Sequence, residues 1–155
     1  MSRFTPRNQS YWLAQLFESN YGKLRELIPE LPDLSGDAIA VSSGKPALLL
    51  TLVERSRYTL TLDLHYGFNS EQHRVAESRF RIRVYLDGKC AEALTENRHD
   101  VRDSAEPAQR RSQGARILEE KWSANYFLER WLSHCLKNHY RFARSSRTQD
   151  AAALV

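Results

Sequence analysis

The stretch FRIRVYLDGKCAEAL, from Phe80 to Leu94, decides the fold. Asp87-Gly88 interrupts it, and this dipeptide is typical of a tight two-residue turn of type I′. Before the turn, apolar residues alternate with arginines and a tyrosine, which is the pattern of a strand with one buried face. The stretch therefore predicts an antiparallel hairpin with one face against a core.

The turn also fixes which residues of the hairpin lie opposite each other. A two-residue loop places Arg83 opposite Glu92 and Tyr85 opposite Cys90. These pairs lie on the polar face of the hairpin. The row of arginines on that face is Arg79, Arg81 and Arg83.

The composition predicts one soluble domain. The 155 residues are 41% hydrophobic and 27% charged, with a net charge of +4, which permits an anionic partner without requiring one. No apolar run approaches the roughly 20 residues that a membrane helix needs, and no signal peptide is expected. Cys90 and Cys135 are far apart in the sequence, which favours a reduced, cytoplasmic protein.

Two amphipathic helices are predicted at the ends of the chain. The first begins at Thr5-Pro6 and ends before Pro29, and the second covers residues 115–142, since apolar residues recur there at spacings of three and four. Trp12 belongs to the apolar stripe of the first helix. Three strands are expected before the hairpin, at residues 39–41, 47–54 and 58–66. The last of them alternates cleanly and should place Tyr58 on the same apolar face as Leu60 and Leu62.

The fold predicted from this order is α+β. A curved antiparallel sheet of about five strands should carry the N-terminal and the C-terminal helix on one face, because each strand needs one face covered. The domain spans residues 1–142. The polar segment 97–114 is expected to be a mobile surface loop, and residues 143–155 a disordered tail. The other face of the sheet is left to solvent or to a partner.

Three stretches together resemble the YqiB-like family, a bacterial domain of unknown function. They are VERSRYT (53–59), IRVYLDGKCAE (82–92) and EKWSANYFLERWLSHCL (120–136). The resemblance implies a small cytoplasmic protein of gammaproteobacterial type, and it implies no established activity. Genes of the family are often near genes for nucleotide hydrolases and cyclic-nucleotide phosphodiesterases, which keeps a nucleotide- or phosphoester-acting enzyme as the least favoured hypothesis.

The motifs of common enzyme classes are missing from the sequence. There is no GxGxxG for a dinucleotide and no GxSxG for a serine nucleophile. Ser43-Gly44-Lys45-Pro46 contains a Gly-Lys pair, but proline stands where a phosphate-binding loop needs Ser or Thr. The five histidines are scattered, so neither a metal site nor a cofactor is predicted. A non-catalytic role is favoured over an enzyme.

Two polar groups are candidate ligand sites. Glu54, Arg57 and Thr59 meet at a strand end, where they could grip a small polar ligand or simply pair across the turn. The second group could bind an anion, or it could be a solvated strand face with one cross-strand ion pair. It consists of Arg83, Tyr85 and Glu92.

The arginine row allows an alternative function. Arg79, Arg81 and Arg83 beside Tyr85 could form a weak nucleic-acid platform, in which arginine binds phosphate and tyrosine stacks on a base.

The second helix offers a candidate partner surface, because its aromatic residues exceed what one buried stripe needs. Tyr126 and Tyr140 are expected off the buried face, where large aromatics anchor protein partners. The preferred hypothesis is therefore a non-catalytic binding or adaptor protein that binds a protein partner or a small anionic ligand.

Overall fold

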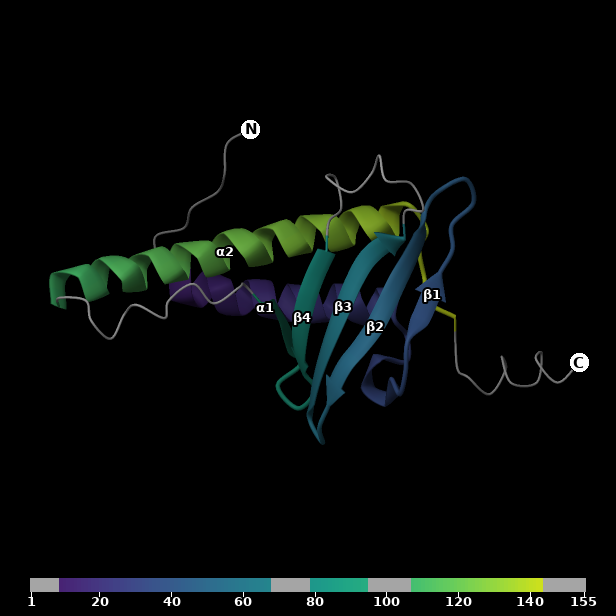
Figure 1. The fold of residues 1–155 in the computed structure, drawn as a ribbon, viewed down its shortest axis with the longest axis horizontal. Coiled ribbons are helices and arrows are strands. Elements are labelled where there is room, and N and C mark those ends of the chain that lie inside the picture. Colours follow the sequence, from purple (N-terminus) through teal and green to yellow (C-terminus); the bar gives the residue numbers. More distant parts are fainter. Residues whose placement is uncertain (1–8, 68–78, 95–106, 144–155) are drawn as a thin grey trace, which may run out of the picture.

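The computed structural model describes residues 9–67, 79–94 and 107–143, and it confirms the α+β prediction. Five strands form one antiparallel sheet in the order β1-β2-β3-β4-β5, with two long helices beside it (Figure 1). The elements are α1 (Gln9–Leu27), a short 3-10 helix η1 (Leu31–Asp33), β1 (Ala38–Ala40), β2 (Ala47–Arg55), β3 (Thr59–Gly67), β4 (Arg79–Tyr85), β5 (Cys90–Ala93) and α2 (Pro107–Lys137).

The core lies between the helices and one face of the sheet. Alternate residues of β3 and β4 point into it, as the pattern predicts, and Leu62 and Ile82 are register partners with no exposed surface. From the helices, Leu24 and Leu128 are fully buried in the same cluster. The opposite face of the sheet is polar towards β4 and β5 and exposes Ile39 at the β1 edge.

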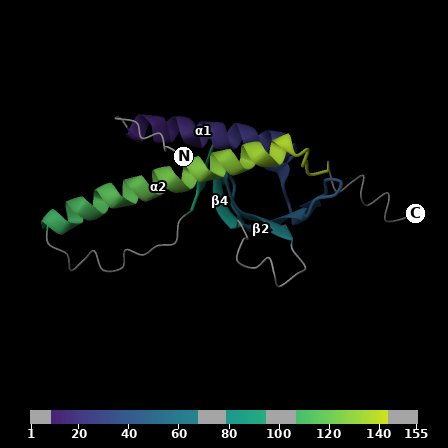
Figure 2. The same ribbon diagram turned by 90° about the horizontal axis from the view of Figure 1, so that it is seen from above.

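The two helices lie side by side and run in the same direction, across the strands (Figure 2). Lys23 of α1 lies 3.6 Å from Glu129 of α2, and the Phe142 amide after α2 donates to the Leu27 carbonyl at the end of α1. A helix as long as α2 measures about 46 Å at 1.5 Å per residue, whereas a five-stranded sheet is only about 19 Å wide. The N-terminal parts of both helices therefore extend past the sheet (Figure 1).

Asn125 joins the helix layer to the edge of the sheet. Its side chain is fully buried, and its Oδ1 accepts a hydrogen bond of 2.7 Å from the Ala93 amide of β5. Its Nδ2 donates to the Lys121 carbonyl at 2.8 Å. An edge amide that would otherwise be open is thereby satisfied by α2.

The hairpin has the predicted register but a different turn. Arg83 lies opposite Glu92 and Tyr85 opposite Cys90, as predicted. The type I′ turn is wrong, because that turn needs a positive φ at both Asp87 and Gly88 and neither has one. Lys89 has φ +53° instead, so the strands are joined by a four-residue loop, 86–89.

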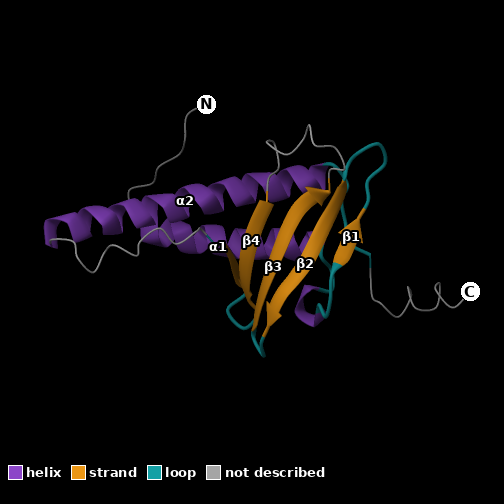
Figure 3. Ribbon diagram, viewed as in Figure 1, coloured by secondary structure: helices purple, strands orange, loops and turns teal. Residues whose placement is uncertain are grey.

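Other boundaries also differ from the predictions (Figure 3). Helix α2 begins at Pro107, so residues 107–114 of the predicted 97–114 loop are helical. The strand predicted from residue 58 begins at Thr59, and Tyr58 is 50% exposed instead of facing the core. The Thr5-Pro6 helix start, residues 97–106 and residues 144–155 lie outside the described residues.

Helix α2 ends in a Schellman motif. His139 has φ +67°, the Tyr140 amide donates to the Cys135 carbonyl at 3.1 Å, and the His139 amide donates to the Leu136 carbonyl at 3.1 Å. The reversal turns Tyr140 back into the core, where it is 2% exposed.

Candidate binding sites

The uncovered face of the sheet carries a bidentate ion pair between neighbouring strands. Arg81 donates from Nε to Oδ1 of Asp63 at 2.9 Å and from Nη2 to Oδ2 at 3.0 Å. These hydrogen bonds hold the pKa of the Asp63 carboxyl below its ordinary value, while partial burial acts in the opposite direction. The positive charge of the Arg81 guanidinium is therefore balanced by the Asp63 carboxylate.

The candidate group Arg83, Tyr85 and Glu92 does come together. The Tyr85 hydroxyl donates to Oε1 of Glu92 at 2.7 Å, and Arg83 lies opposite Glu92 in the register. Burial first, and the neighbouring Glu92 second, raise the pKa of the Tyr85 hydroxyl, while Arg83 acts to lower it. The group is a small network in which the arginine has a carboxylate neighbour, and ligand binding by it stays a prediction.

The arginine row shares one face, as the nucleic-acid hypothesis requires. Arg79 is exposed and lies opposite His65. However, Arg81 is paired with Asp63, and Arg83 has Glu92 across from it. Carboxylates beside two of the three arginines reduce the positive potential that a phosphate backbone would meet. Nucleic-acid binding stays a prediction, and this face is weaker support for it than the sequence alone suggested.

The candidate ligand residues around the turn between β2 and β3 make separate contacts. Glu54 lies opposite Thr61, just after a register shift, and the Arg57 guanidinium lies 5.3 Å from the centre of the Tyr58 ring. Thr59 is the first residue of β3 and is half-buried. In the part of the chain that the structure describes, no ion pair joins Glu54 to Arg57.

Arg55, which the sequence analysis did not single out, has a structural role beside them. Its Nη1 donates to the Leu34 carbonyl at 2.7 Å and its Nη2 to the Pro32 carbonyl at 3.0 Å. One guanidinium thus holds the connector around η1 against the end of β2.

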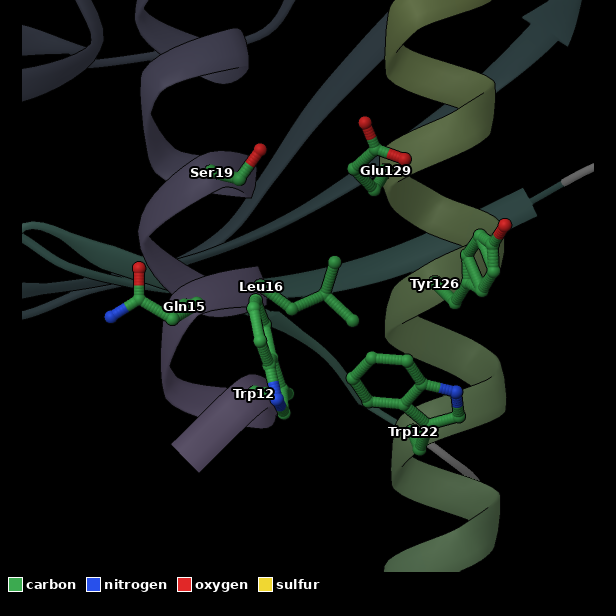
Figure 4. Close-up of a pocket in the computed structure, with 7 residues that line it drawn as sticks. All are labelled: Trp12, Gln15, Leu16, Ser19, Trp122, Tyr126 and Glu129. Carbon is green, nitrogen blue, oxygen red and sulfur yellow. The ribbon is translucent and has the colours of Figure 1, made fainter. Parts of the chain in front are cut away.

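A groove of about 420 Å³ opens between α1 and α2 (Figure 4). Four residues of α1 and three of α2 form its walls, and no predicted site residue except Tyr126 is among them. They are Trp12, Gln15, Leu16, Ser19, Trp122, Tyr126 and Glu129. Trp12 lies in the N-terminal part of α1, which extends past the sheet.

The aromatic residues of the groove differ in exposure. Trp122 is 5% exposed, so it forms a packed part of the wall, whereas Trp12 is 43% exposed. The Tyr126 ring lies 5.9 Å from the Trp122 ring, and the two planes make an angle of 59°. Aromatic surface is thus presented from both helices.

Glu129 supplies the charge at one end of the groove. Its Oε1 is 3.6 Å from Lys23 Nζ and 3.4 Å from Ser133 Oγ, both longer than a strong charge-assisted hydrogen bond. No interaction found among the described residues uses the other oxygen, Oε2. The carboxylate is therefore only loosely held by the described residues around it.

The predicted partner residues have different positions. Tyr126 is half-buried in the groove, but Tyr140 was wrongly expected off the buried face, since it is buried and its hydroxyl donates to the Pro46 carbonyl. Sequence reasoning assigned Trp12 to the buried stripe of the first helix. The stripe does not reveal how far the helix extends beyond the sheet, and this overhang is what exposes the indole.

The buried cysteine is not a nucleophile. Cys135 has no exposed surface, and burial raises the pKa of its thiol to about 11, while the nearby Tyr66 hydroxyl, 3.8 Å from the sulfur, acts in the opposite direction. The thiol is protonated at neutral pH, whereas the thiolate is the reactive form.

The described residues contain neither a cluster of metal ligands nor a helix that could span a membrane. Within residues 9–67, 79–94 and 107–143, no three His, Cys, Asp or Glu side chains gather as a metal site would require. In these same ranges, no helix combines the length and the apolar composition that crossing a membrane requires.

The fold and surfaces define an α+β protein whose single sheet is covered by a parallel pair of helices. The chain matches the family described as "Protein of unknown function (DUF1249)" over residues 23–141, and it belongs to that family. The match includes the whole sheet and the α2 wall of the groove, while the α1 wall precedes it. Comparisons with curated proteins and with solved structures gave no match.

Proposed function

We propose that this protein is a non-catalytic binding domain that holds a protein partner in the groove between α1 and α2. The observation that carries the proposal is Trp12, an indole 43% exposed in a groove that α2 lines with Trp122 and Tyr126. Tryptophan and tyrosine are the residues most enriched at the energetic centres of protein interfaces. A soluble domain exposes a large aromatic side chain in a hollow at a cost, which a partner removes.

Two features favour a protein over a small anionic ligand. Two of the three arginines of the row on the sheet have carboxylates beside them, Arg81 with Asp63 and Arg83 with Glu92. The groove is predominantly aromatic and aliphatic, which suits a side chain or a peptide segment. The cytoplasmic location and the YqiB-like grouping are part of this proposal. Support comes from the free thiols of Cys90 and Cys135 and from the three sequence blocks.

Site-specific photocrosslinking in cells tests the proposal. A photoreactive phenylalanine analogue at Gln15, in the wall of the groove, should give one discrete crosslinked protein band, identified by mass spectrometry. The matched control is the same analogue at Ser43, an exposed turn position outside the groove, which should not give that band.

A second variant tests whether the crosslink depends on the indole of Trp12. Trp12→Leu keeps apolar bulk in the first turns of α1 but removes the indole, so it should reduce the Gln15 crosslink severalfold. An unchanged band in this variant, or equal bands from Gln15 and Ser43, would contradict the proposal.

A further inference from the structure

We infer that the β1 edge of the sheet binds an extended acidic segment of another protein, which pairs with β1 as an additional strand. The acidic residues of this segment lie beside the turn that follows β1. The surface is separate from the groove between α1 and α2, so the inference does not depend on the proposed function. Segments that add a strand to a sheet gain affinity from backbone hydrogen bonds and specificity from alternate side chains.

The outer edge of β1 is the first observation. Strand β1 stands at the end of the strand order, with β2 on its inner side, as Figure 1 shows. Outside the sheet itself, no backbone hydrogen bond among the described residues reaches Ala38, Ile39 or Ala40. Edge strands are commonly protected by shortness, by charged residues or by proline, and this strand is short but has no charge and no proline. Its outer backbone groups therefore have no partner among the described residues.

Two exposed β-branched side chains beside this edge are the second observation. Ile39 is 60% exposed, and Val41, directly after the strand, is 73% exposed. Ile39 lies opposite Leu49 on the face that the helices leave uncovered, whereas Ala40 is buried in the core. An added strand therefore covers this face best with apolar side chains at alternate positions.

Three cations beyond the end of β1 are the third observation. The Ser42 hydroxyl donates to the Asn138 carbonyl at 2.7 Å, which holds the turn after β1 against the end of α2. Neither of the segments that meet there, 42–47 and 137–143, contains an Asp or a Glu. Their exposed cations form no ion pair with another described residue. These cations are Lys45, Lys137 and Arg141.

The positive charge favours an acidic segment from another protein. Every strand pair of this sheet is antiparallel, and an antiparallel addition places the start of the segment beside the turn after β1. Its carboxylates should therefore precede its apolar residues. A second copy of β1 would bring Asp37 to the cations, and this carboxylate already accepts a hydrogen bond from the Leu52 amide. The sequence after residue 143 has two arginines and one aspartate, so it does not supply the missing negative charge.

The side chains beside the cations also favour a peptide over a single-stranded nucleic acid. Bases stack on aromatic rings in such complexes. Here the exposed side chains next to the cations are aliphatic, Ile39 and Val41, and the nearby Tyr140 is buried.

Fluorescence anisotropy of labelled peptides with the full chain tests the inference. The probe is Glu-Glu-Glu-Val-Thr-Val-Thr, blocked at its N-terminus and labelled at its C-terminus. One control has the reversed sequence, and the other has glutamine in place of glutamate. The probe should bind saturably. Each control should bind at least about threefold more weakly, the combined effect of several surface ion pairs.

Methylation of the peptide backbone separates strand pairing from simple attraction of charges. In an antiparallel ladder, alternate residues direct their N–H groups towards the neighbouring strand and away from it. Methylation of the two valine nitrogens and methylation of the two threonine nitrogens should therefore have different effects. One pair should abolish binding, and the other should leave most of it. Equal effects of the two pairs would overturn the strand-pairing assignment.

Matched threonine variants test the apolar part of the surface. Ile39→Thr keeps a β-branched side chain but removes apolar area, so it should weaken binding of the probe severalfold. Val53→Thr makes a comparable change at an exposed valine near the far end of β2, and it should leave binding unchanged. Equal effects of the two variants would contradict the position of the site.

Matched glutamine variants test the charged part. The double variant Lys45→Gln/Arg141→Gln should reduce binding of the glutamate probe towards that of the glutamine peptide. The double variant Arg57→Gln/Lys89→Gln removes the same charge from turns at the opposite end of the sheet, and it should not. If both double variants weaken binding equally, the attraction comes from the net charge of the protein, and the inference fails.

Other occupants of the edge give distinct results. A dimer in sedimentation that Ile39→Thr disrupts would show that a second copy covers β1, and it would overturn the inference. Displacement of the probe by anionic lipid vesicles or by a single-stranded oligonucleotide, with tighter binding than the probe, would overturn it in favour of that partner. The Gln15 crosslink reports only on the groove, so the proposed function and this inference can fail separately.

Discussion

The ion pair between Asp63 and Arg81 changes the function that the row of arginines on the sheet can be expected to have. In the sequence, the arginines at 79, 81 and 83 alternate as if all three faced a ligand. In the sheet, Asp63 lies opposite Arg81 and accepts two hydrogen bonds from it. The partner comes from another strand, 18 residues earlier. Because the predicted pairs covered only the hairpin, this one was missed.

The Asp63–Arg81 pair predicts a specific pH dependence of stability. Asp63 has a lowered pKa in the folded protein, so its contribution is fully present above the unfolded value of about 3.9 and is lost as the pH falls through the folded pKa. Wild type should therefore exceed Asp63→Asn in stability by a constant amount between pH 5 and pH 8. The difference should shrink below the unfolded pKa, as measured by urea unfolding.

The matching variant at the same pair is Arg81→Gln, which removes the donor of both hydrogen bonds. It should remove the largest cause of the lowered Asp63 pKa, so the stability that the wild type gains over this variant should also shrink as the pH falls below the unfolded pKa. A stability difference that instead grows on acidification would show that the pair does not lower the pKa of Asp63.

At the scale of elements, the register of the hairpin and the presence of both helices were predicted correctly. The type of the hairpin turn and the start of α2 were not. Register follows from alternation and from the number of residues between strands, which the sequence contains directly. The turn depends on the φ angle of Lys89, a residue with no strong turn signal. Helix α2 begins at Pro107 in a run of polar residues, where the apolar periodicity used to find helices is missing.

Asn125 should contribute more to stability than an equivalent asparagine without a strand partner. Asn125→Ala leaves the Ala93 amide buried without an acceptor, which should cost about 1–3 kcal/mol. Asn138→Ala is the matched control, since its Nδ2 also donates four residues back, to the His134 carbonyl, but it has no bond to the sheet. Urea unfolding of both variants should show the larger loss for Asn125→Ala.

The Schellman motif gives a stabilising substitution. His139 has φ +67°, a conformation that costs an ordinary residue roughly 1 kcal/mol and glycine little. His139→Gly should therefore raise the free energy of unfolding by about 0.5–1 kcal/mol. Lys137→Gly, two residues earlier in the last helical turn, should lower it by up to about 1 kcal/mol. Equal effects of the two glycines would contradict the assigned helix end.

At the scale of the whole molecule, the candidate site depends on the mismatch between helix length and sheet width. The sequence predicted both helices and about five strands, but it does not show where the strands lie along a helix. Trp12 therefore looked like a core residue, although its helix extends past the sheet. Exposure of this kind is a property of the assembled tertiary structure and could not be predicted from periodicity.

The balance of charges on the sheet predicts weak nucleic-acid binding. Despite the net charge of +4, two of the three arginines of the row have carboxylates beside them. A 20-nucleotide single strand should bind more weakly than about 10 µM at physiological salt, within the range of non-specific complexes. Fluorescence anisotropy checks this. Tight binding that is lost in the double variant Arg79→Glu/Arg83→Glu would contradict this prediction and support the nucleic-acid hypothesis.

The pairing of the first helix with the last has a consequence for synthesis of the protein. The Phe142 amide reaches back to the Leu27 carbonyl, and fully buried Leu128 and Leu132 come from α2. A growing chain that has made α1 and all five strands still lacks half of the helix layer over its apolar sheet. Stable tertiary structure must therefore wait until α2 leaves the ribosome, and the nascent chain needs protection from aggregation until then.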